Sequence, residues 1–190
     1  MHLVVGLGNP GREYEGHRHN IGFMAIEELR RAEGFPDFRE KFSGVWARGE
    51  IAGEAVALLE PRTFMNLSGE SVQPAAAFLK VAPANVIVVH DELDIPFGDV
   101  RLKQGGGHAG HNGLRSILQR LGTPDFLRVR VGIGRPPPAF RGDVADYVLR
   151  DFDASERAEL PAVVTRALDA VRRVVADGIA HAMKAVNTRL

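Results

Sequence analysis

The 190-residue sequence has no cysteine, no long apolar run and no excess of charge of either sign. Without cysteine, disulfide bonds and thiolate metal ligands are excluded, and a reducing cytoplasm is the expected compartment. No stretch of about 18 apolar residues is present, so we expect no membrane span. The first residues, MHLVVGLGNPG, lack the basic segment and long apolar core of a signal peptide. These absences favour a cytoplasmic protein without a membrane partner.

Serine nucleophiles are also poorly represented. The chain has five serines, and none lies in a G-x-S-x-G turn, the motif that exposes a nucleophilic serine at the end of a strand. Ser68, in the motif NLSG, is predicted to cap a helix. If the protein is a hydrolase, water is therefore the expected nucleophile.

The charge is neutral overall but unevenly distributed. Between Arg101 and Arg141 the chain carries eight basic residues and one acid, Asp125, although the whole chain has 24 of each kind. A local basic face fits contact with a polyanion such as RNA. An arginine-rich surface that is merely solvated is the alternative reading.

Apolar runs and glycine turns predict alternating strands and helices. We expect one helix that begins after Asn20, with Asn20 as its cap, a second after Asn66, a third over residues 113–122 and a fourth from about residue 155. Residues 127–134 should form a strand with one solvated face. The other expected strands lie at 3–8, 44–51, 54–60, 86–91 and 100–104. The pattern predicts an α/β fold, a single three-layer α/β/α domain over residues 1–190 with a mixed, twisted central sheet.

Polar residues recur beside glycine turns that follow apolar runs. Ligands of open α/β sheets bind beyond the carboxyl ends of the strands, so these residues are expected to form one site. They are Asn9 in GLGNPG, His19 in HRHN, Asn66 in FMNLSG, Asp91 in HDELD, and His111 with Asn112 in GGGHAGHNG.

A histidine and an aspartate in one site suggest general-base catalysis. A carboxylate bonded to an imidazole fixes its tautomer and stabilises the imidazolium that forms when it takes a proton. His19 and His17 could each fill this role beside Asp91. Asparagine amides would then orient the substrate and polarise a carbonyl group.

Two other site chemistries are open to the same residues. GLGNPG matches the dinucleotide fingerprint G-x-G-x-x-G, but Pro10 removes an amide where a phosphate needs one, and no helical pattern follows directly. His108 and His111 are spaced H-x-x-H and, with His90 and Asp91, could bind a metal, but they lie in a glycine loop rather than on one helical face. We expect neither a nucleotide cofactor nor a metal.

Six sequence blocks together resemble the bacterial-type peptidyl-tRNA hydrolases. They lie in the family's order over about residues 3–136 and read GLGNPG, HRHNIG, FMNLSG, HDELDIPFG, GGGHAGHNGLRSI and RVRVGIGRP. The resemblance implies hydrolysis of the ester that joins a peptide to the 3′ ribose of tRNA. It also implies a monomer with no cofactor and no obligate protein partner. A non-catalytic RNA-binding module and a nucleotide-dependent oxidoreductase are the alternative functions.

The resemblance also implies roles for individual residues. It assigns the catalytic histidine to His19, the acid that supports it to Asp91, and the selector for N-blocked aminoacyl groups to Asn9. At the position two before His19, where the family usually has threonine, this chain has His17. The implied substrate and tRNA contacts are Tyr14, Phe64, Met65, Asn66, His111 and Asn112, with Lys103 and Arg130 at the tRNA phosphates. Residues 135–150 could form a mobile cover over the cleft.

Overall fold

The computed structural model describes residues 1–188, in which seven strands form one mixed sheet in the order β2-β3-β4-β1-β5-β7-β6. Four adjacent strands, β4, β1, β5 and β7, are parallel, while β2, β3 and β6 run antiparallel to their neighbours. The strands are β1 (His2–Gly6), β2 (Arg39–Lys41), β3 (Gly44–Ile51), β4 (Glu54–Pro61), β5 (Val86–Glu92), β6 (Val100–Gln104) and β7 (Leu127–Gly132).

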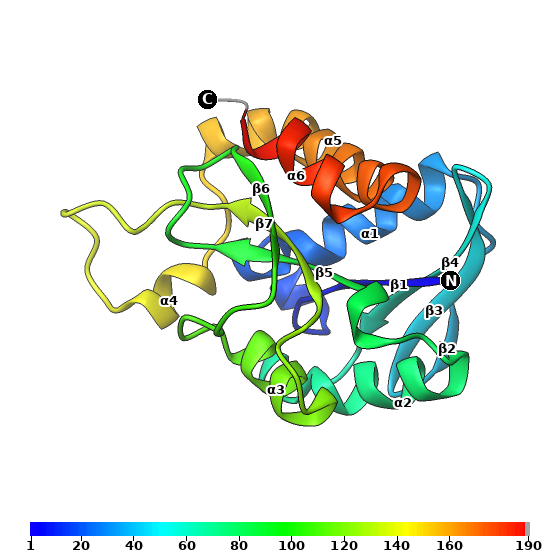
Figure 1. Ribbon diagram of the computed structural model, residues 1–190. Coiled ribbons are helices and arrows are strands. Elements are labelled where there is room, and N and C mark those ends of the chain that lie inside the picture. The colour runs from blue at the N-terminus through cyan, green and yellow to red at the C-terminus, as the bar shows by residue number, and fades with distance from the viewer. Residues whose placement is uncertain (189–190) are drawn as a thin grey trace.

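Helices cover both faces of this sheet, as Figure 1 shows. One apolar core lies between the sheet and the helices α1, α5 and α6, and a second lies between the sheet and α2 and α3. The helices are α1 (Ile21–Ala32), α2 (Gly69–Leu79), α3 (Asn112–Leu121), α4 (Val144–Val148), α5 (Ala154–Asp177) and α6 (Ile179–Asn187). The predicted α/β class with a mixed sheet in three layers is confirmed.

Several local predictions were wrong for identifiable reasons. The Asn20 side chain does not cap α1, because it binds the backbone of Asn9 instead. The Ser68 hydroxyl does not cap α2, because it donates to the carbonyl of Met65. Strand β7 has no solvated face. Leu127, Val129 and Val131 pack in the core on one side, and on the other side Arg128 is buried against the carbonyls of Gly106 and Gly107 and only Arg130 is partly exposed. The predicted C-terminal helix is divided at Gly178, whose φ of 83° ends α5.

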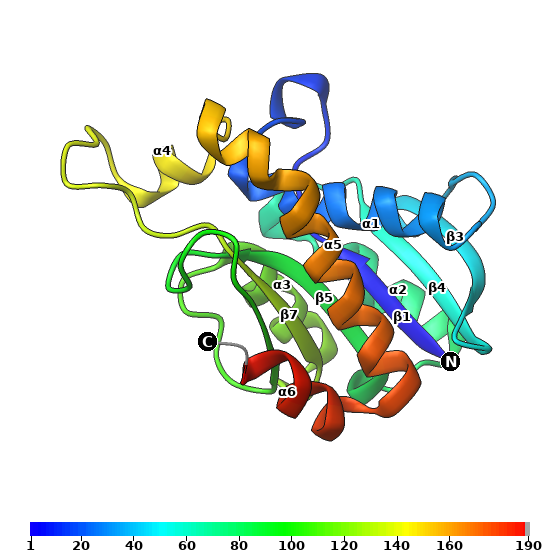
Figure 2. The ribbon, with the colours of Figure 1, turned by 90° about the horizontal axis from the view of Figure 1, so that it is seen from above.

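One close contact in the fold brings His19 to the end of β5. Gly22 allows α1 to start directly against the sheet, since a Cβ there would lie 2.5 Å from the backbone of Leu7 and of Val89. The 3-10 turn η2 (Arg18–Asn20), which carries His19, is thereby held beside the end of β5. Beyond the same strand ends lies α4, and in Figure 2 α4 and the proline loop before it project from the body of the molecule.

None of the helices within residues 1–188 is long and apolar enough to cross a bilayer.

Candidate active site

A cavity of about 740 Å³ opens beyond the carboxyl end of β5. Nine of the eleven predicted site residues line it, contributed by four separate parts of the chain. These nine are Asn9, Tyr14, His19, Phe64, Met65, Asn66, Asp91, His111 and Asn112. The structure thus brings residues that are distant in the sequence together at one cavity beyond the strand ends.

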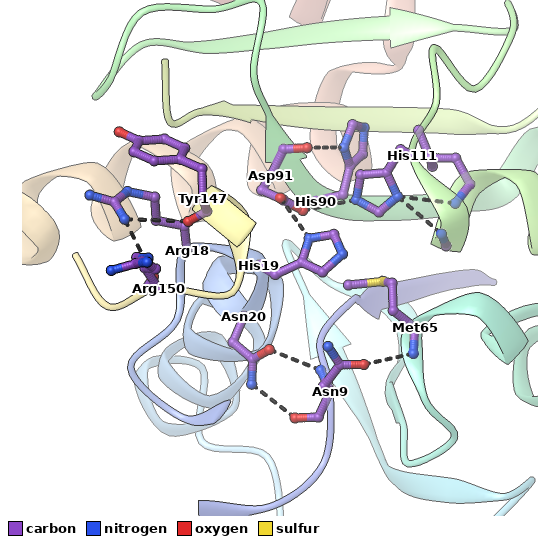
Figure 3. Close-up of polar contacts among 12 residues, drawn as sticks. Asn9, Arg18, His19, Asn20, Met65, His90, Asp91, His111, Tyr147 and Arg150 are labelled. Atoms are coloured by element: carbon purple, nitrogen blue, oxygen red, sulfur yellow. Dashed lines mark hydrogen bonds and ion pairs between the residues drawn. The ribbon is translucent and has the colours of Figure 1, made fainter. Parts of the chain in front are cut away.

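Asp91 is the centre of the polar cluster, and its side chain is almost completely buried. One carboxylate oxygen, Oδ2, lies 2.7 Å from Nδ1 of His19, and the other, Oδ1, lies 2.8 Å from Nε2 of His111 (Figure 3). Burial by itself would raise the pKa of Asp91, but the charges and hydrogen bonds of the two imidazoles hold it well below its usual range. The carboxylate is thus ionised and accepts from both rings.

His111 is fixed in one tautomer by the start of α3. Its Nδ1 accepts from the backbone amides of Gly113 and Leu114, at 3.1 and 3.3 Å, and so caps the helix. A ring nitrogen that accepts hydrogen bonds carries no proton, so the proton lies on Nε2 and is donated to Asp91. His111 is therefore a donor that orients the carboxylate.

His19 has the opposite arrangement, with its proton on Nδ1. Because Asp91 can only accept, Nδ1 donates, and the lone pair lies on Nε2, which has no partner within residues 1–188. Burial lowers the pKa of His19, but the negative charge of Asp91 and its hydrogen bond outweigh burial, and the pKa is raised above 6.5. This imidazole has the geometry and polarity of a general base.

His17 does not reach this cluster. Its Nε2 lies 3.8 Å from Asp151, and its ring packs edge-on against Tyr14. Of the two histidines that the sequence left open, only His19 contacts Asp91.

Asn9 is held by three hydrogen bonds that leave one group free. The side chain of Asn20 accepts from the backbone amide of Asn9 and donates to the backbone carbonyl of Asn9, both at 2.9 Å. The backbone amide of Met65 donates to the side-chain oxygen of Asn9, Oδ1, at 2.8 Å. Since the Met65 amide can only donate, the Asn9 oxygen faces it, and the Asn9 Nδ2 remains available at the cavity (Figure 3). The site therefore presents a fixed amide donor.

The remaining walls are partly apolar and partly amide. Asn66 and Asn112 are exposed at the cavity, and the ring of Phe64 is 55% exposed with its edge near Tyr14. The opposite wall lies within residues 135–150, the segment expected to cover the cleft. It is formed by α4 and the residue after it, through Val144, Ala145, Val148 and Leu149, none of which the sequence singled out.

Lys103 and Arg130 do not line the cavity. They project from β6 and β7, where Arg101 lies opposite Arg130 and Lys103 lies opposite Arg128. Arg130 pairs with Glu92 at 3.0 Å, next to Asp91 in the chain. Arg128 is buried, and its guanidinium donates to the carbonyls of Gly106 and Gly107, so it has a structural role.

The alternative site chemistries are poorly matched by these contacts. The Asn9 amide in the glycine motif is occupied by Asn20, and the following segment is a 3-10 turn rather than the helix that a dinucleotide site requires. His108 accepts from the amide of Gly110 and is absent from the His19–Asp91–His111 cluster, the one group within residues 1–188 that could converge on a metal. A metal bound to Nε2 of His111 would displace the proton on that nitrogen. The proton would then lie on Nδ1, which could no longer accept from the amides at the start of α3, so the helix cap would be lost.

The comparisons with known proteins identify the family. The sequence matches the family model for peptidyl-tRNA hydrolase over residues 3–190. The chain belongs to the peptidyl-tRNA hydrolase family. It is 64% identical over 189 residues to a peptidyl-tRNA hydrolase of Sorangium cellulosum, covering 100% of this chain and 85% of that protein. It is 48% identical to one from Geobacter metallireducens, covering 98% and 95% of the two chains.

The fold agrees with this assignment. The crystal structure of peptidyl-tRNA hydrolase from Acinetobacter baumannii superimposes with a TM-score of 0.91 at 41% sequence identity, covering 99% of this chain and 95% of that one. The family and the hydrolase class predicted from the sequence motifs are confirmed, and the oxidoreductase and non-catalytic alternatives are not favoured.

Proposed function

We propose that this chain cleaves the ester between a peptide and the 3′ ribose of tRNA with a water molecule activated by His19. The observation that carries the proposal is the contact between Nδ1 of His19 and Asp91, which leaves the Nε2 lone pair at the cavity. In the first step Nε2 takes a proton from water while the water oxygen bonds to the ester carbonyl carbon. In the second step the imidazolium gives that proton to the departing ribose oxygen, and the products are a free carboxyl group and a 3′ hydroxyl.

Asparagine amides would position the acyl group. The free Nδ2 of Asn9 can donate to the first carbonyl of an N-blocked substrate, whereas the ammonium of a free aminoacyl ester would oppose it, donor against donor. Asn66 and Asn112 lie across the same cavity and would orient and polarise the scissile carbonyl. Tyr14, Phe64 and Met65 supply aromatic and apolar surface near these amides.

Lys103 and Arg130 would bind tRNA phosphates outside the cavity, on the adjoining face of β6 and β7. Each phosphate contact adds up to about −0.9 to the slope of log K against log salt concentration. Lys103→Ala and Arg130→Ala should therefore each flatten that slope and raise KM more than they lower kcat. Arg48→Ala, on an exposed residue of β3 at the opposite end of the sheet, is the matched control. Slopes equal to wild type in both variants would place the tRNA elsewhere.

The reaction needs no metal or cofactor in this scheme, because His19 and Asp91 supply the proton transfer. All the groups invoked come from one chain, which supports a monomer, and a product of translation as substrate supports a cytoplasmic enzyme without a membrane partner. Residues 135–150 would cover the cleft, since α4 forms a cavity wall, and the exposed proline loop before α4 would be its mobile part.

The experiment that tests the proposal compares His19→Ala with His17→Ala on N-acetyl-aminoacyl-tRNA. Loss of a general base lowers kcat by about 10²- to 10⁴-fold. We expect that loss for His19→Ala with an unchanged circular dichroism spectrum, and near-normal kcat for His17→Ala. Turnover close to wild type in a folded His19→Ala protein would refute the assignment.

A further inference from the structure

Arg18, the residue before His19, joins the η2 turn to α4. It is 5% exposed, although arginine is rarely buried without partners. Its backbone amide donates to the carbonyl of Arg150 at 3.0 Å. From the side chain, Nη1 lies 3.4 Å from the carbonyl of Tyr147 and 3.5 Å from that of Arg150 (Figure 3).

The guanidinium is also packed on its flat face and bonded at its far end. Its Cζ lies 4.0 Å from the centre of the Tyr147 ring, in the position of a cation–π contact. Its Nη2 donates to Glu156 of α5 at 2.7 Å. Because the side chain is planar with several fixed donors, these contacts together define where α4 lies relative to η2.

The same short helix has a second face over the active site. Tyr147 turns toward Arg18, whereas Val144, Ala145 and Val148 line the cavity that contains His19. A change at the Arg18 contacts would therefore move the apolar wall relative to the catalytic imidazole. No other side chain within residues 1–188 donates to the carbonyls of Tyr147 and Arg150.

We propose that Arg18 is a positioning residue that locks α4 to the His19 segment and so sets the width of the cleft for the acyl group of the substrate. This inference rests on the proposed function, since it assumes that the acyl group occupies the cavity. Arg18 does not touch the reacting atoms. Its effect should fall chiefly on KM.

The test compares Arg18→Met, which keeps the aliphatic stem but no donor, with Arg18→Lys, which keeps the charge and one pairing group. Arg157→Met is the matched control, because Arg157 is exposed and donates only to the carbonyl of Phe152 nearby. A misplaced binding wall can cost up to about 100-fold in rate. We expect kcat/KM to fall by about tenfold in Arg18→Met, mainly through KM, by less in Arg18→Lys, and to stay at the wild-type value in Arg157→Met.

Hydrogen exchange gives a readout that does not depend on activity. The amides of residues 144–150 should exchange faster in Arg18→Met, while those of β1 and β5 keep wild-type protection. Unchanged exchange at 144–150 would overturn the proposal, as would a loss confined to kcat with KM unchanged. If exchange at 144–150 rises but KM does not, Arg18 holds α4 without affecting the substrate, and the catalytic part of the proposal fails. Failure of the proposed ester hydrolysis itself would instead appear as an inactive wild-type enzyme.

Discussion

Two buried carboxylates lie on parallel strands of the same sheet and have opposite charge states. Asp91 on β5 is ionised, with each oxygen bonded to an imidazole. Glu60 on β4 is 0% exposed, and its Oε1 lies 3.3 Å from Arg62, while its Oε2 has no partner within residues 1–188. Burial, together with the nearby charge of Glu27, raises the pKa of Glu60 to about 8 despite Arg62 and Arg30. Donors, more than burial, decide which carboxylate is charged.

The two carboxylates also differ in what they face. Asp91 faces a cavity, and its negative charge favours the protonated form of His19, which of its two ring partners is the one whose second nitrogen has no partner within residues 1–188. Glu60 lies on the α1 side of the sheet with Glu27 and Arg30 for neighbours and does not line the cavity. The predictions below alter one carboxylate or introduce a new one.

The largest effect is expected for Asp91→Asn. An amide facing Nδ1 of His19 can donate its own N–H, which would leave the His19 proton on Nε2 and remove the base. We expect kcat to fall by about 10³-fold or more. With the charge gone, only burial acts on His19, and its pKa should drop from above 6.5 to below it. The acid limb of the pH profile of kcat/KM should move down accordingly, because His19 must be unprotonated to act.

His111→Asn is the matched control for that change. Asparagine is a good helix cap, so α3 keeps an acceptor for its first amides while Asp91 loses one of its two donors. The acid limb should then stay above pH 6.5, with kcat reduced far less than in Asp91→Asn. Equal losses in both variants would show that the second imidazole matters as much as the negative charge of Asp91 beside His19.

The sequence predicted the residues of the candidate site better than the contacts that hold those residues in place. Asn9, His19, Asp91 and His111 follow apolar runs or glycine turns, and strand-end geometry brings such residues together. The sequence gives no sign that Asn20 binds Asn9, because an asparagine before a helical pattern looks like a cap. Such lateral contacts form between segments far apart in the chain.

The contacts of Arg18 and the burial of Glu60 escaped prediction for the same reason. Arg18 contacts residues more than 125 positions away, so its role has no local signature. Glu60 ends the apolar run AVALLE, and a charged residue at the end of such a run normally indicates that the strand is leaving the core. It is buried on the α1 side of the sheet, next to Glu27 and Arg30, and its Oε2 has no partner within residues 1–188. Sequence periodicity reports which face is apolar and does not report which polar atom finds a donor.

The next largest effect is expected for Asn9→Asp, which replaces the free amide donor of Asn9 with a carboxylate. The Met65 amide would bond one oxygen, as it bonds Asn9 Oδ1 now, and favour the ionised form. That carboxylate accepts from an ammonium and cannot donate to a carbonyl. A buried carboxylate facing a carbonyl that it cannot pair with costs about 1–3 kcal/mol, which corresponds to about a 5- to 150-fold change in kcat/KM.

The measurement is kcat/KM for N-acetyl-aminoacyl-tRNA divided by kcat/KM for the unacetylated ester. The ratio should fall in Asn9→Asp by the factor above. Ala109→Asp, on an exposed residue of the same cavity that has no assigned role, is the control for adding negative charge there. If both rates fall together in Asn9→Asp and the ratio is unchanged, Asn9 has a structural role only.

The smallest effect on catalysis, and a measurable one on stability, is expected for Glu60→Gln. In the unfolded chain Glu60 titrates near 4.5, whereas in the folded protein its pKa is about 8. A folded-state pKa above the unfolded one means that stability is full below pH 4.5 and is lost as pH rises toward 8, by about 1.4 kcal/mol per pH unit. Glutamine carries no charge in either state, so the variant should escape this loss, with Tm gaining about 2–4 °C for each kcal/mol.

The difference in Tm between Glu60→Gln and wild type should therefore grow from pH 5 to pH 8, with kcat unchanged because Glu60 lies outside the cavity. Glu50→Gln, on the exposed face of the neighbouring strand β3, supplies the control for removing one negative charge. A Tm difference that is constant with pH would mean that Glu60 is ionised in the folded protein. Asp91 and Glu60 would then both be charged, and burial without a full set of donors would be compatible with an ionised carboxylate in this sheet.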